Sequence, residues 1–259
     1  MLGGFPELGS ACKPGKVYIV GAGPGDPELI TVKGLRLVRE ADVIFYDRLI
    51  PQEVLREAKP SAKLVFVGKA PGKHTYTQDE INRMLVEEAC KGKTVVRLKG
   101  GDPYVFGRGE EECMYVLEHG VPCEVVPGVT SAIAGPAYAG IPVTHRGIAS
   151  SFAVVTGREA LEKGRRMVNY GAIAKAVDTL VILMGVSNLE NIVREILDAG
   201  VDPETPVAIV ERATMPEQRV VVGNLANIVE KARKAGVKPP AVVVVGKVVR
   251  LRDKLWKFA

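Results

Sequence analysis

The alternation of short β-branched runs with helical patterns is the feature that most constrains this fold. In the first half of the chain, five strand-like runs are separated by segments of helical periodicity. They span residues 17–20, 43–46, 63–67, 94–98 and 123–126. Strands that alternate with crossover helices build a parallel sheet. The first half therefore predicts an α/β domain with a parallel sheet.

The second half has a different strand pattern. Its strand candidates span residues 152–156, 179–184, 206–211, 219–222 and 241–245. The connection between the third and fourth suits a hairpin rather than a helical crossover. We therefore expect a mixed sheet in a second α/β domain. The predicted division is a tail at 1–15, an N-terminal domain at 16–126 and a C-terminal domain at 127–259.

Capping residues place several helix boundaries. Thr77 opens a T-x-x-E capping box, which predicts a helix over residues 77–91. Ser187 opens a second box of the same kind, with glutamate three residues later. Asn224 is expected to cap a helix that ends at residue 236.

The cysteine pattern and the apolar runs bear on location. The four cysteines show neither C-x-x-C pairing nor clustering with the three histidines; they are Cys12, Cys90, Cys113 and Cys123. We therefore expect reduced thiols, no metal site and a cytoplasmic protein. No apolar run approaches the ~20 residues of a membrane-spanning helix, and the first sixteen residues lack the pattern of a secretory signal.

The charge balance favours an anionic partner. Thirty-five Lys and Arg against 30 Asp and Glu give a net charge of +5. Nucleic acid is one such partner, but aromatic residues make up only 5% of the chain and no basic run contains interleaved aromatics. The composition therefore favours an enzyme that acts on a polyanionic small molecule.

Ligands of an open parallel sheet bind beyond the carboxyl ends of its strands. The segments that follow the five predicted strands begin at Gly21, Asp47, Gly68, Lys99 and Pro127. They place glycines, two carboxylates and several cations at one edge of the sheet. We therefore expect the chemistry of the first domain at this edge.

The glycine-rich segments at this edge have two interpretations each. The first loop resembles a dinucleotide fingerprint, but Asp26 stands where the last glycine is required, which disfavours NAD binding. Its glycines then serve either a ligand or a tight strand exit. Gly100 and Gly101 allow close approach of a ligand, and Asp102 offers a carboxylate acceptor, whereas a simple turn is the alternative.

Charged residues at the same edge and in a later loop are also ambiguous. Asp47 is either a general base or half of an ion pair. Lys69 could bind a substrate carboxylate or transfer a proton. The alternative is that it is a solvated lysine in a loop. His145 and Arg146 together suit anion recognition, although a lone histidine is usually structural.

Several motifs are distributed along nearly the whole chain, and they include V-G-A-G-P-G-D-P, V-V-R-L-K-G-G-D-P and V-P-G-V-T-S-A. They occupy residues 20–27, 46–49, 95–103, 106–109, 126–132, 137–146, 184–185 and 211–214. These motifs resemble those of the uroporphyrinogen-III C-methyltransferases, within the tetrapyrrole methylase superfamily. Taken together these motifs are highly specific, whereas the first loop alone is weak.

The resemblance implies two α/β domains with S-adenosylmethionine in the cleft between them, and no metal. The implied reaction transfers two methyl groups to C-2 and C-7 of uroporphyrinogen III. It gives precorrin-2 by way of precorrin-1, with two S-adenosylhomocysteine, for sirohaem or cobalamin synthesis. A homodimer is also implied. By the same resemblance, the cofactor-binding residues are Pro24, Gly100, Gly101, Asp102, Val105, Thr130, Ser131, Met184, Ala213 and Thr214.

The resemblance further implies that Asp47 accepts a proton and that Lys69 donates one. Because arginine forks bind carboxylates, we select five basic residues to recognise the substrate: Arg48, Arg97, Arg108, His145 and Arg146. Structural ion pairs are the alternative for Arg97 and Arg108. The chain departs from many relatives at Arg158, where they have histidine after the glycine.

Two other classes of function are compatible with this fold or with the basic net charge. Other methylases of the superfamily act on cobalamin precursors, on protein or on ribosomal RNA. Asp47 and the Thr-His-Arg at 144–146 favour uroporphyrinogen as the substrate. From a different class, a non-catalytic nucleotide- or RNA-binding protein is supported only by the basic charge and the glycine loops. The chain length predicts a single activity without a fused module.

Overall fold

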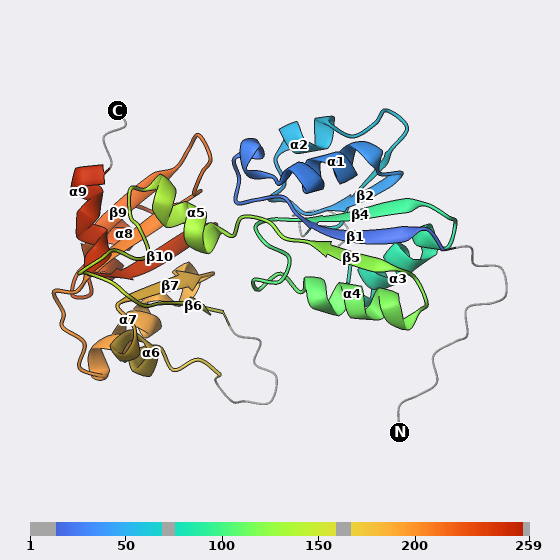
Figure 1. Cartoon of the computed structure of the whole chain (residues 1–259). Coiled ribbons are helices and arrows are strands. Elements are labelled where there is room, and N and C mark those ends of the chain that lie inside the picture. The colour runs from blue at the N-terminus through green and yellow to red at the C-terminus, as the bar shows by residue number, and fades with distance from the viewer. Residues whose placement is uncertain (1–13, 69–75, 159–166, 256–259) are drawn as a thin grey trace, which may run out of the picture. The chain divides into compact units, whose positions relative to one another are not determined.

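A computed structural model describes residues 14–68, 76–158 and 167–255 of the chain, which divides into two compact units, Met1–Thr130 and Ser131–Ala259 (Figure 1). The first unit contains β1 (Lys16–Gly21), η1 (Pro27–Leu29), α1 (Val32–Glu40), β2 (Val43–Tyr46), α2 (Gln52–Arg56), β3 (Lys63–Phe66), α3 (Gln78–Ala89), β4 (Thr94–Lys99), α4 (Gly109–Glu118) and β5 (Cys123–Val126). The second contains α5 (Ser131–Tyr138), β6 (Phe152–Thr156), α6 (Tyr170–Ala176), β7 (Thr179–Leu183), η3 (Val186–Asn188), α7 (Leu189–Asp198), β8 (Pro206–Glu211), β9 (Arg219–Asn224), α8 (Ile228–Lys234), β10 (Ala241–Gly246), η4 (Lys247–Leu251) and α9 (Arg252–Leu255).

The sheet of the first unit has the strand order β3-β2-β4-β1-β5, and every neighbouring pair is parallel. The predicted parallel sheet is therefore confirmed. Side chains alternate between its faces, so that Ile19 packs toward α3 and α4 whereas Val20 packs toward α1 and α2. Figure 1 shows these two helix pairs on opposite faces of the sheet. Both faces are covered, which explains why the strands are apolar throughout.

The sheet of the second unit has the order β6-β7-β10-β8-β9 and is mixed, as predicted. β6 and β7 are parallel, β10 is antiparallel to both of its neighbours, and β8 and β9 form the expected antiparallel pair. Helices α6, α7 and α8 contribute to one apolar core with the sheet. Gly135 of α5 lies against Val242 of β10, which allows this helix to approach the strand closely.

One of the three predicted caps is confirmed and two are wrong. Thr77 and Glu80 form the full capping box at the start of α3. Ser187 instead lies inside η3, so α7 begins one residue later, after Asn188. Asn227, rather than Asn224, precedes α8, and the two asparagines exchange side-chain to backbone hydrogen bonds. In both cases an additional tight turn separates the expected cap from its helix.

The expectation of reduced thiols is wrong. Cys113 of α4 and Cys123 of β5 form a disulfide, with their Cα atoms 5.8 Å apart. The chain reverses direction between α4 and β5, which brings two cysteines ten positions apart within disulfide reach. Cys90 is disulfide-bonded as well, whereas Cys12 lies outside the described residues. The spacing rules used on the sequence do not detect a pairing that depends on this reversal.

Within the described residues, none of the helices is both long enough and apolar enough to cross a membrane.

Candidate active site

Hydrogen bonds join three strand-end loops at the carboxyl edge of the first sheet. Gly101 N donates to Gly23 O at 2.7 Å, which connects the loops that follow β1 and β4. Asp102 Oδ2 accepts from Gly128 N at 3.0 Å, which connects the loop after β5 to the loop after β4. Asp102 Oδ1 also accepts from Tyr104 N at 2.8 Å, as in a tight turn. Three of the five predicted loops therefore meet at one edge.

Two glycines at this edge are required by the close approach of the loops. A Cβ atom on Gly21 would lie 2.6 Å from Gly101 O, and one on Gly128 would lie 2.2 Å from the same oxygen. The tight strand exit is therefore a sufficient explanation for Gly21 and Gly128. Asp26, which interrupts the dinucleotide pattern, accepts from Glu28 N at 2.9 Å and caps η1.

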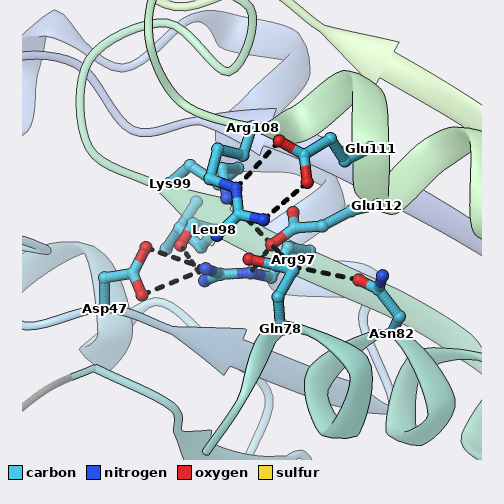
Figure 2. A network of polar contacts seen from close by, with 9 residues as sticks. All are labelled: Asp47, Gln78, Asn82, Arg97, Leu98, Lys99, Arg108, Glu111 and Glu112. Carbon is cyan, nitrogen blue, oxygen red and sulfur yellow. Dashed lines mark hydrogen bonds and ion pairs between the residues drawn. The ribbon is translucent and has the colours of Figure 1, made fainter. Parts of the chain in front are cut away.

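Asp47 directly follows β2 and is held by an arginine from the neighbouring strand (Figure 2). Arg97 Nη2 donates to Asp47 Oδ1 at 3.0 Å and to Oδ2 at 2.9 Å. The side chain of Arg97 is 3% exposed and that of Asp47 is 33% exposed. Asp47 thus belongs to an ion pair, yet its carboxylate remains partly open to solvent.

Glu112 of α4 binds the other side of the same guanidinium. Its Oε1 accepts from Arg97 Nε at 3.1 Å, from Lys99 Nζ at 2.9 Å and from Gln78 Nε2 at 3.1 Å (Figure 2). The Glu112 side chain is 0% exposed. Burial lowers the pKa of Lys99, and the charge of Arg97 lowers it further. Burial also opposes the charge on Arg97, but Glu112 and Asp47 together raise its pKa.

The other basic candidates for substrate recognition lie at the surface. Arg108 pairs with Glu111 through two hydrogen bonds of 2.8 and 2.6 Å. The hydrogen bonds that Arg108 donates to Glu111 raise the pKa of Arg108, although burial opposes this shift. Arg48, His145 and Arg146 are exposed. Exposure leaves these three side chains accessible to a charged ligand.

The second unit presents its candidate residues at one edge of its own sheet. Both β7 and β8 run antiparallel to β10, so their carboxyl ends lie at the same edge. Met184 follows β7, and Ala213 and Thr214 follow β8. Met184 and Thr214 have φ angles of 55° and 68°, a left-handed conformation that costs free energy for residues other than glycine. Strain of this kind concentrates at functional sites.

The remaining candidates occupy less distinctive positions. Pro24 and Val105 are half-buried in the loops after β1 and β4, and Gly100 is exposed. Thr130 ends the first unit and Ser131 begins α5. Lys69 lies outside the described residues. Across the described parts of the chain, no group of three or more His, Cys, Asp and Glu side chains is placed to hold a metal ion.

Comparison with known families matches residues 16–229 to the model for Tetrapyrrole (Corrin/Porphyrin) Methylases. The chain belongs to the tetrapyrrole methylase family. The resemblance inferred from the motifs is thereby confirmed, and so is the fold class of two α/β units with a parallel and a mixed sheet.

Individual relatives of this tetrapyrrole methylase extend over nearly its full length. A uroporphyrinogen-III C-methyltransferase of Methanocaldococcus jannaschii is 57% identical over 240 residues, which cover 92% of this chain and 98% of that protein. One from Bacillus subtilis is 49% identical, covering 93% of each. A structure of uroporphyrin-III C-methyl transferase from Thermus thermophilus complexed with S-adenyl homocysteine is 47% identical with a TM-score of 0.77, covering 92% of this chain and 94% of that one.

Sequence reasoning missed Glu112, Lys99 and Gln78 as parts of the Asp47 network. The sequence of this methylase does contain one indication of the network, namely the spacing of its two cations. Arg97 and Lys99 stand two positions apart in an apolar strand and so share one face of the sheet. Two buried cations on one face require buried acceptors, and the acidic helix after that strand is the nearest source in the sequence.

Proposed function

We propose that this chain methylates uroporphyrinogen III, with S-adenosylmethionine as methyl donor, to give precorrin-2. The observation that carries the proposal is the 57% identity to a uroporphyrinogen-III C-methyltransferase along 98% of that protein. Two methyl groups go to C-2 and C-7, and precorrin-1 is the intermediate. Two molecules of S-adenosylhomocysteine leave. The product feeds sirohaem or cobalamin synthesis.

S-adenosylmethionine supplies the electrophilic methyl group when it is bound. In this proposal the loops after β1 and β4 contribute Pro24, Gly100, Gly101, Asp102 and Val105 to its site, and Thr130, Ser131, Met184, Ala213 and Thr214 contribute from the rest of the chain. The local structure fits this role. Gly100 exposes backbone without a side chain, and the left-handed conformations of Met184 and Thr214 support a site at the second sheet edge.

Asp47 serves as the proton acceptor in the proposed reaction. Methylation of a pyrrole carbon places positive charge on the ring, and a bridge proton must then leave. A positioned carboxylate that accepts this proton lowers the barrier. Asp47 suits the role because it is oriented by Arg97 and still 33% exposed. Lys69 is proposed as the proton donor by resemblance to the family alone.

Arg48, Arg108, His145 and Arg146 are proposed to bind the carboxylates of uroporphyrinogen III, which has eight of them. Their exposure supports this role. Arg97 differs, because its guanidinium already bonds Asp47, Glu112 and Leu98 O. We therefore assign it to Asp47 rather than to the substrate, which revises the expectation from sequence.

An anaerobic assay with S-adenosylmethionine and freshly generated uroporphyrinogen III tests the proposal. We expect two methyl groups per substrate molecule, identified from the mass and absorption of the product. Binding of S-adenosylhomocysteine without methyl transfer would instead indicate a different tetrapyrrole substrate. That alternative has structural support, since a cobalt precorrin-4 methyltransferase matches with a TM-score of 0.81 at 30% identity, covering 90% of this chain and 95% of that one.

The proposal also includes a homodimer, which light scattering on the purified protein would measure. The cytoplasmic location stays a prediction. The disulfide between Cys113 and Cys123 removes the argument from reduced thiols on which that prediction was partly based.

A further inference from the structure

We propose that Glu112 is a positioning residue that orients Asp47 through Arg97 for methyl transfer. The inference rests on the proposed function, in which Asp47 accepts a proton. Glu112 lies on α4, Arg97 on β4 and Asp47 at the end of β2, so three separate elements supply the three side chains. Exposure increases along this series from 0% to 3% to 33%. A fully buried anion is thus linked through one cation to the accessible carboxylate.

The guanidinium of Arg97 is fixed on three sides. Nε donates to Glu112 Oε1 at 3.1 Å, Nη1 donates to Leu98 O at 3.1 Å, and Nη2 donates to both oxygens of Asp47. Because the group is planar and rigid, the bonds on the Glu112 side determine where Nη2 points. Asp47 is consequently held in one orientation by a group that cannot rotate while Glu112 remains in place.

Four charged side chains of this network form ion pairs with one another. Asp47 and Glu112 carry the two negative charges, and Arg97 and Lys99 carry the two positive charges. Without the Glu112 charge, Asp47 would remain as the carboxylate bonded to Arg97, while Glu111, which Figure 2 also draws, is bonded to Arg108. We expect Arg97 then to leave its present orientation and Lys99 to compete for Asp47.

Stability alone does not account for Glu112. A buried ion pair is often no more stabilising than apolar residues of similar volume. Glu112 Oε2 is moreover buried with no hydrogen-bond partner among the described residues, which costs free energy. The buried Oε2 atom of Glu112 therefore lowers the stability of the fold, and the residue is linked through Arg97 to the partly exposed carboxylate of Asp47. A role in positioning Asp47 explains Glu112 better than stability does.

The test compares Glu112→Gln with Glu88→Gln. Glu88 is a matched control because it is also a buried carboxylate that pairs with cations. Its partners are Lys63, Lys91 and Lys93, at the amino-terminal end of the strands. We expect Glu112→Gln to lower kcat by ~10- to 100-fold, because misplaced groups cost rates of this order. The KM for uroporphyrinogen III and the Kd for S-adenosylhomocysteine should stay within about twofold. Glu88→Gln should leave kcat unchanged.

A double-mutant cycle separates positioning from general damage. If Glu112 acts through Asp47, Glu112→Gln lowers the single-turnover rate by less than about twofold in the Asp47→Asn background. An equal loss in both backgrounds would overturn the proposal, and so would a parallel change in KM and in the Kd for S-adenosylhomocysteine. Should Glu112→Gln fail to fold, Arg97→Lys is measured in the same cycle, since a single ammonium group cannot span both carboxylates.

A crystal structure of Glu112→Gln keeps this inference distinct from the proposed function. If the unmodified enzyme transfers no methyl group to uroporphyrinogen III, the proposed function fails, but the orientation of Asp47 by Glu112 through Arg97 can still be tested. We expect Arg97 Nη2 to lie beyond hydrogen-bonding distance of Asp47 in the variant. An Arg97 that still donates to both oxygens of Asp47 overturns the inference.

Discussion

At the scale of single residues, Asp47 combines an ion pair with partial exposure to solvent. It is bonded to a buried arginine, yet a third of its side chain is exposed. An exposed ion pair contributes little stability, and a fully buried carboxylate is inaccessible to a ligand. Asp47 lies between these limits, which suits a group that must keep its orientation and still meet a substrate.

We expect Asp47→Asn to lower turnover by ~10²- to 10⁴-fold, the range that general base catalysis typically contributes. The amide cannot accept the bridge proton but has nearly the same shape. Binding of S-adenosylhomocysteine, measured by calorimetry, should therefore persist with a similar Kd. Unchanged turnover would remove Asp47 from the mechanism.

Arg146 permits a test of substrate recognition. It is exposed, so removal of its side chain should not disturb the fold. We expect Arg146→Ala to raise the KM for uroporphyrinogen III by ~10-fold, because a hydrogen bond to a charged group contributes about 1.5–3 kcal/mol. Arg233→Ala is the control, since that arginine pairs with Glu190 at the surface at 3.4 Å. An unchanged KM in Arg146→Ala contradicts its proposed role.

The position of Asp47 could be predicted from sequence, but its partners could not. Asp47 directly follows a recognisable strand, so its place at the sheet edge follows from the α/β pattern. Arg97 and Glu112 are 15 positions apart on different elements, and their contact depends on how α4 packs against the sheet. The disulfide between Cys113 and Cys123 was missed for the same reason.

At the scale of elements, Glu88 joins the end of α3 to the starts of β3 and β4. Its carboxylate accepts from Lys93 at 2.6 Å, Lys63 at 3.1 Å and Lys91 at 3.2 Å. Hydrogen bonds from Lys93, and then from Lys63 and Lys91, lower the pKa of Glu88 from 4.5 to about 2, although burial opposes the shift. This ionised carboxylate stabilises the fold at neutral pH.

The stabilisation from Glu88 should depend on pH with a definite sign. Because the pKa is lower in the folded state, the stabilising contribution is fully present above the unfolded value near 4.5 and is lost as the pH falls toward about 2. We expect Glu88→Gln to lower the free energy of unfolding by about 1–3 kcal/mol at pH 7. Urea unfolding at several pH values should show this difference shrinking below pH 4.5. A difference independent of pH would contradict the ionic role.

The prediction of elements from sequence was strongest where local signals agree. The five strands of the first sheet follow from β-branched runs, and the start of α3 follows from its capping box. The predicted caps at Ser187 and Asn224 are wrong because a short turn displaces the start of each helix. Each turn follows the end of a strand, β7 or β9, and so depends on how that strand ends in the packed sheet. The hydrogen bonds of a helix cap are local, but packing of the whole domain decides which residue lies at the cap position.

At the scale of the whole molecule, the excess of positive charge matches the charge of the proposed substrate. The net charge of +5 attracts a molecule with eight carboxylates over distances longer than any hydrogen bond. The attraction is screened by salt, because the Debye length falls from about 10 Å at 0.1 M to about 3 Å at 1 M. S-adenosylhomocysteine has no net charge at neutral pH and should not be attracted in this way.

We therefore expect the KM for uroporphyrinogen III to rise several-fold when ionic strength increases from about 0.05 to 0.5 M. The Kd for S-adenosylhomocysteine should change by less than about twofold over the same range, since its binding relies on short-range contacts. Steady-state kinetics and calorimetry in matched sodium chloride buffers measure both quantities. A KM that does not respond to salt would mean that local contacts alone recognise the carboxylates. Equal changes in both quantities would point instead to a general effect of salt on the fold.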